Sequence, residues 1–296
     1  MVAQADKTAT NVRQVQLLIA GKFVDAASGE TFTTTDPATN KVIAQVAKAG
    51  KEDVDRAVAA ARTAFDEGPW PRMSPYERGR VIQKLADRIR ERADEIARLE
   101  SIDSGKPITR SKGEILSSAM VFDYYAGAGD KFFGETIPMG HAALDFTLRE
   151  PVGVCGQIVP WNFPFMMASW KVAPALAAGC TIILKPASNT PLSAMILGEI
   201  CYEAGVPEGV VNVLPGPGGE IGEYLASHPL VDKIAFTGET ATGARILRAS
   251  SDTIPCCSHS AFAPIAAACR ATSAASSDGR NTSTMSTGSG MSAIVR

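Results

Sequence analysis

Short apolar runs broken by turn residues occupy the first part of the chain. Residues 15–46 contain several brief β-type runs, separated by the dipeptides Gly21-Lys22 and Asp36-Pro37. Both dipeptides favour turns, so the segment predicts a small β-meander. The polar residues 1–13 lack the basic start and apolar core of a signal peptide, and they are expected to form a disordered leader.

Apolar residues then recur at helical spacing in three segments. The pattern predicts amphipathic helices over residues 51–65, 74–103 and 115–128. Ser74 and Glu77 have the spacing of a capping box, which favours a helix start at this point. None of the three segments carries an evident catalytic pattern, so they are expected to act as a scaffold.

From Pro151 onwards the pattern changes to apolar strands that alternate with helices. Strands are expected at residues 152–159, 180–184, 210–214 and 233–236. Helices are expected between them, at residues 166–178, 191–204 and 219–227. Strands that are apolar on both faces are typical of parallel sheets covered by helices. The predicted fold class is therefore α/β, a doubly wound parallel sheet preceded by the small β and helical region.

The composition excludes several classes of partner. Of 296 residues, 45% are hydrophobic and 20% are charged, which is ordinary for a globular protein. Because 29 basic residues balance 31 acidic ones, neither nucleic acid nor an anionic membrane is expected as a partner. No apolar run is long enough to span a bilayer. The six cysteines lack metal-ligand spacing, so no metal site is expected, and a cytoplasmic location is predicted.

Three loops leave the carboxyl ends of the expected strands, where a doubly wound sheet binds its ligands. In the loop 160–164, two prolines stiffen the backbone around Asn162, whose amide is a donor suited to an oxyanion; a capped turn is the alternative. In the loop 185–188, Lys185 can donate to ribose or phosphate, or it is a surface lysine. The loop 237–243 is a Gly-x-x-x-x-Gly turn that suits phosphate but also a plain helix start.

The standard nucleotide fingerprints are absent from these loops. The turn over residues 216–222 lacks the Gly-x-Gly-x-x-Gly pattern, because Ile221 stands where its last glycine belongs. The loop 237–243 is not a Walker P-loop, because Ala244-Arg245 stand where Lys and Ser or Thr are required. Neither turn on its own identifies a ligand.

Taken together, the loops resemble the aldehyde dehydrogenase family in order and spacing. The motifs that carry the resemblance are Cys155–Pro164 (CGQIVPWNFP), the Lys185-Pro186 pair, Asn212–Gly216 (NVLPG) and Phe236–Gly243 (FTGETATG). The resemblance runs from about Val15 to Ile254. It implies a Rossmann-like coenzyme-binding domain of the aldehyde dehydrogenase type, incomplete in this chain, over residues 14–254. It also implies a hairpin arm for oligomerisation near residues 140–150.

The resemblance implies a chemistry and a role for each matching residue. In the family a cysteine thiolate attacks the aldehyde, a hydride passes to NAD or NADP, and a glutamate activates water. Asn162 corresponds to the amide that stabilises the oxyanion, and Lys171 to a lysine associated with proton relay. Coenzyme contacts are implied for Ile158, Val159, Pro160, Trp161, Lys185, Ser188, Gly218, Gly222, Phe236, Gly238 and Glu239.

Ser188 bears on the choice of coenzyme. It occupies a position where strongly NAD-selective members carry a glutamate that accepts from a ribose hydroxyl. A serine removes the repulsion of a 2′-phosphate, so tolerance of NADP as well as NAD is predicted.

The pattern breaks after Ile254. Residues 255–296 are rich in Ser, Ala and Thr and show neither helical nor strand periodicity, so they are expected to be a disordered tail outside the family. Ala261 stands at the expected distance of the catalytic glutamate, and no glutamate follows Glu239. Cys256, Cys257 and Cys269 are not expected to act as nucleophile, because a disordered tail cannot hold a thiolate against a substrate. A frameshift or a mispredicted exon is the favoured explanation of the break.

Three functional hypotheses stay open. The chain is an aldehyde-oxidising family member that is inactive alone, a non-catalytic dinucleotide-binding module, or a fragment that joins a homo- or hetero-oligomer. Met166, Met167 and Trp170 either form one wall of an aldehyde tunnel or, as helices more commonly do, pack in the core.

Overall fold

Strands from distant parts of the chain meet in one six-stranded sheet. The computed structural model describes residues 12–141, 143–250 and 269–277. The sheet order is β11 (Lys233–Phe236), β8 (Val154–Ile158), β9 (Thr181–Lys185), β10 (Val211–Val213), β2 (Leu17–Ile19) and β3 (Lys22–Val24). The first four strands are parallel, which confirms the predicted α/β fold class and the four strands expected after Pro151.

The predicted β-meander over residues 15–46 was wrong in its pairing. The hairpin of β2 and β3 joins the central sheet, where β2 runs antiparallel to β10. The other early strands, β1 (Arg13–Val15), β4 (Thr31–Thr35) and β5 (Val42–Ala47), form a separate sheet in which β1 pairs with β5 in parallel. Leu17 and Leu18 are both buried and belong to different core clusters, so β2 needs cover on both faces and finds it at the edge of β10.

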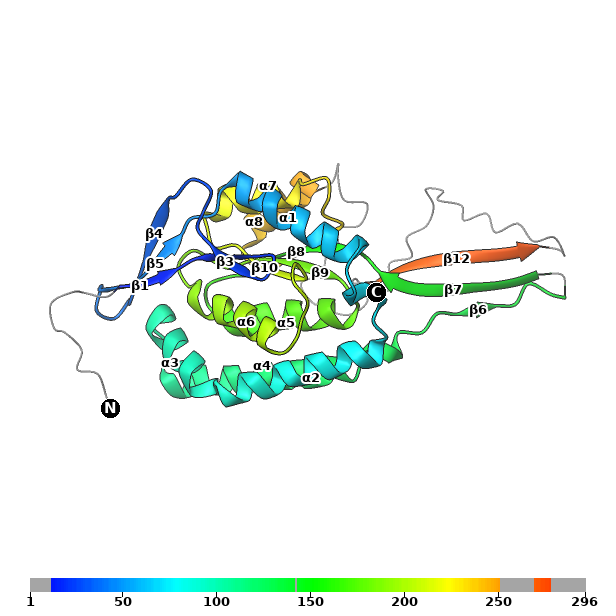
Figure 1. Ribbon diagram of the computed structural model, residues 1–296, viewed down its shortest axis with the longest axis horizontal. Helices are drawn as coiled ribbons and strands as arrows, with labels where there is room; N and C mark the ends of the chain where they lie inside the picture. Colours follow the sequence, from blue (N-terminus) through cyan, green and yellow to red (C-terminus); the bar gives the residue numbers. More distant parts are fainter. Residues whose placement is uncertain (1–11, 142, 251–268, 278–296) are drawn as a thin grey trace.

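Helices cover both faces of the central sheet (Figure 1). On one face lie α1 (Lys51–Asp66), α7 (Glu223–Ala226) and α8 (Thr240–Ser250). On the other lie α5 (Pro164–Ala177) and α6 (Leu192–Glu203), with α2 (Pro75–Glu91), α3 (Ala93–Ser104) and α4 (Ile108–Ala126) packed outside them. Short turns complete the set: η1 (Trp70–Arg72), η2 (Gly129–Lys131) and the π-helical η3 (Gly218–Gly222).

The single helix expected over residues 74–103 is two helices. The capping box of Ser74 and Glu77 is present at the start of α2. The chain leaves helical geometry at Arg92, where φ is −98° and ψ is 11°. The Arg92 guanidinium contacts Glu199 and Glu203 of α6 at 3.4 and 3.1 Å. Packing of α3 on α6 therefore interrupts a run whose residues favour one continuous helix.

Two other helix boundaries differ from the predictions. The helix expected at 115–128 begins at Ile108, directly after Pro107, because Pro107 supplies a fixed φ at the helix start. The segment expected as a helix over 219–227 is a π-helical turn followed by the four residues of α7.

An arm projects from the body of the molecule (Figure 1). It consists of β6 (Thr136–Ile137) and β12 (Cys269–Ser277), which pair antiparallel with β7 (Ala143–Pro151) on its two sides. The predicted disorder of residues 255–296 is therefore wrong for β12. The backbone edge of β7 can pair with any extended segment that keeps its N–H groups, so β12 needs no side-chain periodicity. The rest of that predicted tail up to residue 268 and from 278 onwards, and residues 1–11 of the predicted leader, lie outside the described residues.

The core lies on both sides of the central sheet. In β9, Ile182 packs into the cluster under α5 and α6, whereas Ile183 packs into the cluster under α1. A Cβ added to Gly198 of α6 would lie 2.5 Å from Leu18 and 2.8 Å from Val213, so only glycine allows this helix to approach the sheet so closely. No helix in the described ranges is long and apolar enough to cross a bilayer.

Candidate functional site

The three predicted loops meet at one edge of the sheet. The backbone amide of Val159 donates to the carbonyl of Lys185 at 3.2 Å, and that of Thr237 donates to Ile158 at 3.1 Å. Because β8, β9 and β11 are parallel, their carboxyl ends lie side by side, and the loops that follow them form a common rim. Ile158 and Val159 are buried, Pro160 is half-buried, and Trp161 is 57% exposed.

Lys185 brings a buried cation to this rim. The residue is 3% exposed, and its Nζ donates to the carbonyl of Pro186 at 2.8 Å. Burial lowers the pKa of Lys185 to about 8, since desolvation disfavours the charged ammonium. A Cβ added to Gly218 would lie 3.6 Å from this Nζ. The glycine thus leaves space directly beside a cation for which the described residues supply one hydrogen-bond acceptor.

The turn after β10 closes the rim on this side. Ser188 donates its hydroxyl to the carbonyl of Gly216 at 2.7 Å, which ties the second loop to this turn. A Cβ added to Gly222 would lie 3.8 Å from Ile158, so the two predicted coenzyme residues are neighbours. Ile221, which breaks the dinucleotide fingerprint, is fully buried. Its side chain has a packing role that a glycine could not fill.

The third loop lies against an aromatic ring. Cβ atoms added to Gly238 and Gly243 would lie 2.6 and 3.3 Å from the ring of Phe236. Both glycines of the Gly-x-x-x-x-Gly turn therefore allow the backbone to pass close to this ring. Glu239 is exposed, and its carbonyl accepts from the amide of Gly243 at 2.9 Å as α8 begins.

Lys171 connects α5 with the third loop. Its Nζ donates to the hydroxyl of Thr237 at 2.8 Å. Burial, and secondarily the charge of Lys233, lower the pKa of Lys171 to about 8. On the same helix Met167 packs partly against the core, whereas Trp170 is 44% exposed.

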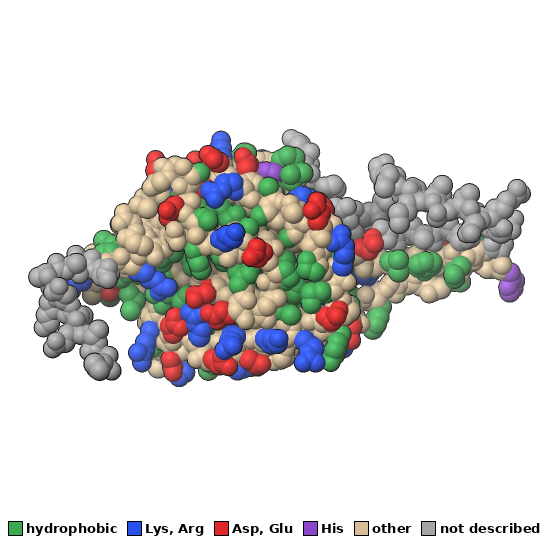
Figure 2. Space-filling view, in the orientation of Figure 1, with side chains coloured by type: hydrophobic (Ala, Val, Ile, Leu, Met, Phe, Trp, Pro, Cys, Tyr) green, Lys and Arg blue, Asp and Glu red, His purple; other side chains and the backbone are tan. Residues whose placement is uncertain are grey.

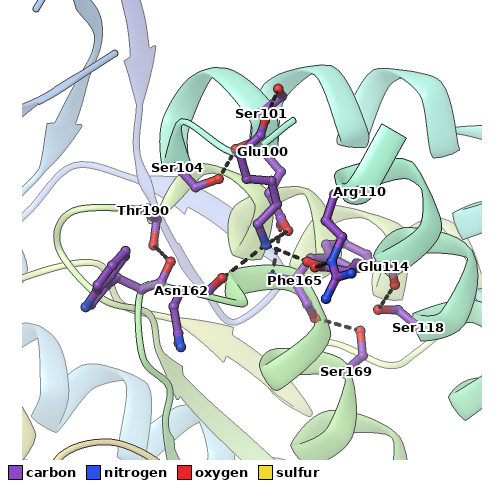
Figure 3. Close-up of polar contacts among 12 residues, drawn as sticks. Glu100, Ser101, Ser104, Arg110, Glu114, Ser118, Asn162, Phe165, Ser169 and Thr190 are labelled. Atoms are coloured by element: carbon purple, nitrogen blue, oxygen red, sulfur yellow. Dashed lines mark hydrogen bonds and ion pairs between the residues drawn. The ribbon is translucent and has the colours of Figure 1, made fainter. Parts of the chain in front are cut away.

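Asn162 lies on a loop whose backbone is held from outside the sheet. Its carbonyl accepts from Nζ of Lys106 at 3.0 Å, and the neighbouring carbonyl of Trp161 accepts from the hydroxyl of Thr190 at 3.1 Å. The amide of Phe165 donates to Glu100 at 3.1 Å. Figure 3 shows the side chain of Asn162 directed away from these contacts, which leaves its exposed amide free of them.

Sequence reasoning missed Lys106, Glu100 and Thr190. Lys106 follows the helix expected to be only a scaffold and Glu100 lies within it, and their contacts with the first loop span 56 and 65 residues. A charged residue in an amphipathic helix usually faces solvent, so burial of Glu100 has no local signal. Within the described ranges no group of side chains has the composition of a metal site.

Sequence comparison identifies relatives of this chain. The model of the family described as "Aldehyde dehydrogenase family" matches residues 23–260, so the match begins later than Val15 and extends beyond Ile254. Aldehyde dehydrogenase family 2 member B4, mitochondrial, of Arabidopsis thaliana is 55% identical over 237 residues, which are 80% of this chain and 44% of that protein. Benzaldehyde dehydrogenase, mitochondrial, of Antirrhinum majus is 51% identical and covers 83% of this chain and 46% of its own length.

Solved structures agree with the fold. The NAD+ complex of aldehyde dehydrogenase from Bacillus cereus matches with a TM-score of 0.81 at 48% identity, over 83% of this chain and 50% of that one. The NAD-dependent aldehyde dehydrogenase from Sinorhizobium meliloti also gives 0.81, at 43% identity, over 85% and 51%. The chain thus spans about half the length of the relatives it matches. On these matches and on the order of its loops, the chain belongs to the aldehyde dehydrogenase family.

Proposed function

We propose that this chain is the coenzyme-binding half of an enzyme that oxidises an aldehyde to a carboxylic acid with NAD or NADP. The observation that carries the proposal is the buried ammonium of Lys185 beside the space left by Gly218. A buried cation to which the described residues offer one acceptor gains from ribose or phosphate oxygens that accept from its remaining N–H donors. The residues at the rim therefore fit the expected coenzyme.

In this proposal, different loops of the rim bind different parts of the coenzyme. Lys185 and Ser188 bind the adenosine ribose, and the first loop contacts the coenzyme next to the reaction site. The remaining contacts come from Gly218, Gly222, Phe236, Gly238 and Glu239, while Ile158, Val159, Pro160 and Trp161 supply those of the first loop. When bound, the nicotinamide accepts the hydride that leaves the substrate carbon.

Asn162 and Lys171 act on the substrate side. The exposed amide of Asn162 donates to the aldehyde oxygen as negative charge develops on it, which an oriented amide does without reorganisation. Lys171, with a pKa of about 8, can hold or release a proton near neutral pH while Thr237 fixes its Nζ.

The proposal for this chain by itself is coenzyme binding without turnover. The cysteines whose side chains the structure describes, Cys155, Cys180 and Cys201, are all buried. None of them is exposed beside Asn162 as a nucleophile must be.

Assembly with a second copy or a full-length homologue through the arm is the alternative, since Leu144 and Leu148 of β7 are 57% and 51% exposed and hydrophobic side chains follow the arm in Figure 2. A cytoplasmic location stays a prediction.

The test is calorimetric titration of the purified chain with NAD and with NADP. Binding that disappears in Lys185→Met supports the proposal, and no binding by the unsubstituted chain at millimolar coenzyme contradicts it. A parallel assay measures NAD(P)H from a panel of aldehydes, for the chain alone and for the chain fused to the second half of a family member. Activity in the fusion only supports a coenzyme-binding half, whereas activity in the chain alone overturns the claim that it lacks turnover.

A further inference from the structure

A lysine from outside the sheet contacts the loop that carries Asn162. Lys106 lies between α3 and α4, and its side chain is 13% exposed. Its Nζ is 3.0 Å from the carbonyl oxygen of Asn162 and 4.8 Å from the centre of the Phe163 ring. The same Nζ contacts a carboxylate oxygen of Glu114 and lies 3.5 Å from one of Glu100.

Two buried carboxylates hold this lysine in place. Glu100 of α3 is fully buried, and Glu114 of α4 is 7% exposed. Figure 3 shows both carboxylates and the backbone of Asn162, from three separate elements, converging on one point. Arg110 contacts the other oxygen of Glu114 at 3.2 Å. The ammonium therefore has defined partners on one side and the Asn162 carbonyl on the other.

Lys106 and Glu100 bind the backbone of the loop on both sides of Phe163. Lys106 binds the carbonyl of Asn162, and Glu100 accepts from the amide of Phe165 in the first turn of α5. Phe163 itself has φ −138° and ψ 63°, which is neither helical nor extended geometry. Pro160 and Pro164 restrict their own φ angles, and Pro164 also restricts the backbone of Phe163 before it, but neither proline fixes the backbone of Asn162. Tertiary contacts are thus needed to give the Asn162 side chain one direction.

We propose that Lys106 is a positioning residue for the Asn162 amide, acting through the backbone carbonyl of residue 162. The inference rests on the proposed role of Asn162 as oxyanion donor. Such a donor works only when its position is set before the reaction, to within about 0.5 Å. Lys106 meets this need because its own position is determined by Glu100 and Glu114.

The test uses two samples of the ligand-free chain, one labelled with 15N-asparagine and one with 15N-phenylalanine, because exchange of the Phe165 amide is read from the second. The chain has six asparagines, and loss of one signal in Asn162→Ser assigns the resonances of Asn162. Lys106→Met keeps the apolar stem but removes the donor and the charge. The backbone order parameter at Asn162 is expected to fall from about 0.85 to below about 0.6, and exchange of the Phe165 amide is expected to quicken about tenfold.

A second variant separates positioning from charge balance. Lys106→Met combined with Glu114→Gln removes one carboxylate together with the ammonium. The free energy of unfolding measured in urea is therefore expected to return close to that of the unsubstituted chain. The disorder at Asn162 should persist in this variant, because the donor is still missing. The control is Lys112→Met on α4, whose lysine pairs with Asp94 at the surface, and it should change neither signal.

Each outcome decides the proposal. An ordered Asn162 in the double variant would overturn it, as would loss of folding by both Lys106 variants, since either result reduces Lys106 to a structural counter-ion. Because no coenzyme is present, the measurement stands whether or not the chain binds NAD. Absence of coenzyme binding would contradict the proposed function alone.

Discussion

Replacing Lys185 by methionine should stabilise the chain while it abolishes coenzyme binding. Burial lowers the pKa of Lys185 from 10.5 to about 8, so at pH 7 the protonated ammonium costs the folded state about 3 kcal/mol. Methionine has a similar length and no charge. It also leaves the carbonyl of Pro186 without its donor, at a cost of about 1 kcal/mol. We expect Lys185→Met to raise the free energy of unfolding by about 2 kcal/mol at pH 7.

The pH dependence of that gain is the sharper test. Because the folded-state pKa is below the unfolded one, the unfolded chain binds more protons between pH 8 and 10.5. The unsubstituted chain therefore gains stability as the pH rises through this window, and its deficit relative to Lys185→Met should shrink and then reverse. The exposed Lys84→Met is the control and should show no such change.

The assay is urea unfolding of the three chains at pH 7, 8.5 and 10, paired with NAD titration at pH 7. A stability difference that does not vary with pH would refute the reasoning, because it would mean that desolvation of the ammonium is not the cause. A gain in stability with unchanged NAD affinity would leave the electrostatic argument intact but remove Lys185 from the coenzyme site.

Three other substitutions test the site and its support. Burial raises the pKa of Asp103 from 3.8 to about 6, so its contribution to stability falls as the pH rises from about 4 to 6. Asp103→Asn should remove this fall and raise the free energy of unfolding at pH 7, measured in urea, by about 1–2 kcal/mol. An unchanged pH profile would contradict this prediction. Ser188→Glu should weaken NADP binding and tighten NAD binding in calorimetry, with no change in preference counting against the proposal. Gly198→Ala should destabilise the chain by about 1–3 kcal/mol. The control is Gly113→Ala, at an exposed helix position with nothing within 4 Å of the added Cβ, and it should stabilise the chain by up to about 1 kcal/mol. Equal effects of the two substitutions in thermal unfolding would refute the close packing of α6.

The sequence alone was sufficient where structure depends on neighbours along the chain. Successive side chains of a strand point to opposite faces, so Ile182 and Ile183 face different core clusters, and the apolar run there predicted a strand covered on both sides. The capping box at Ser74 is also a local contact, over three residues. The order of the loops after β8, β9 and β11 followed from the same patterns, and with it the edge at which they meet.

Tertiary structure decided the features that local preference leaves open. Nothing near Leu17 indicates that its strand will pair with β10 across nearly two hundred residues, because hydrogen bonding by a backbone edge does not depend on side-chain identity. The break at Arg92 arises in the same way, from carboxylates on α6 and not from the helix propensity of its own segment.

The candidate site divides along the same line. The prolines around Asn162 and the lysine that ends β9 are visible in the sequence, because each loop carries its own chemistry. The hydrogen bond from Lys106 to the Asn162 carbonyl is not visible there, since the amino-acid sequence does not show which distant backbone atom a charged side chain will contact. Packing of α3, α4 and α5 made that choice, because it brings two carboxylates and the Asn162 carbonyl within reach of the Lys106 ammonium.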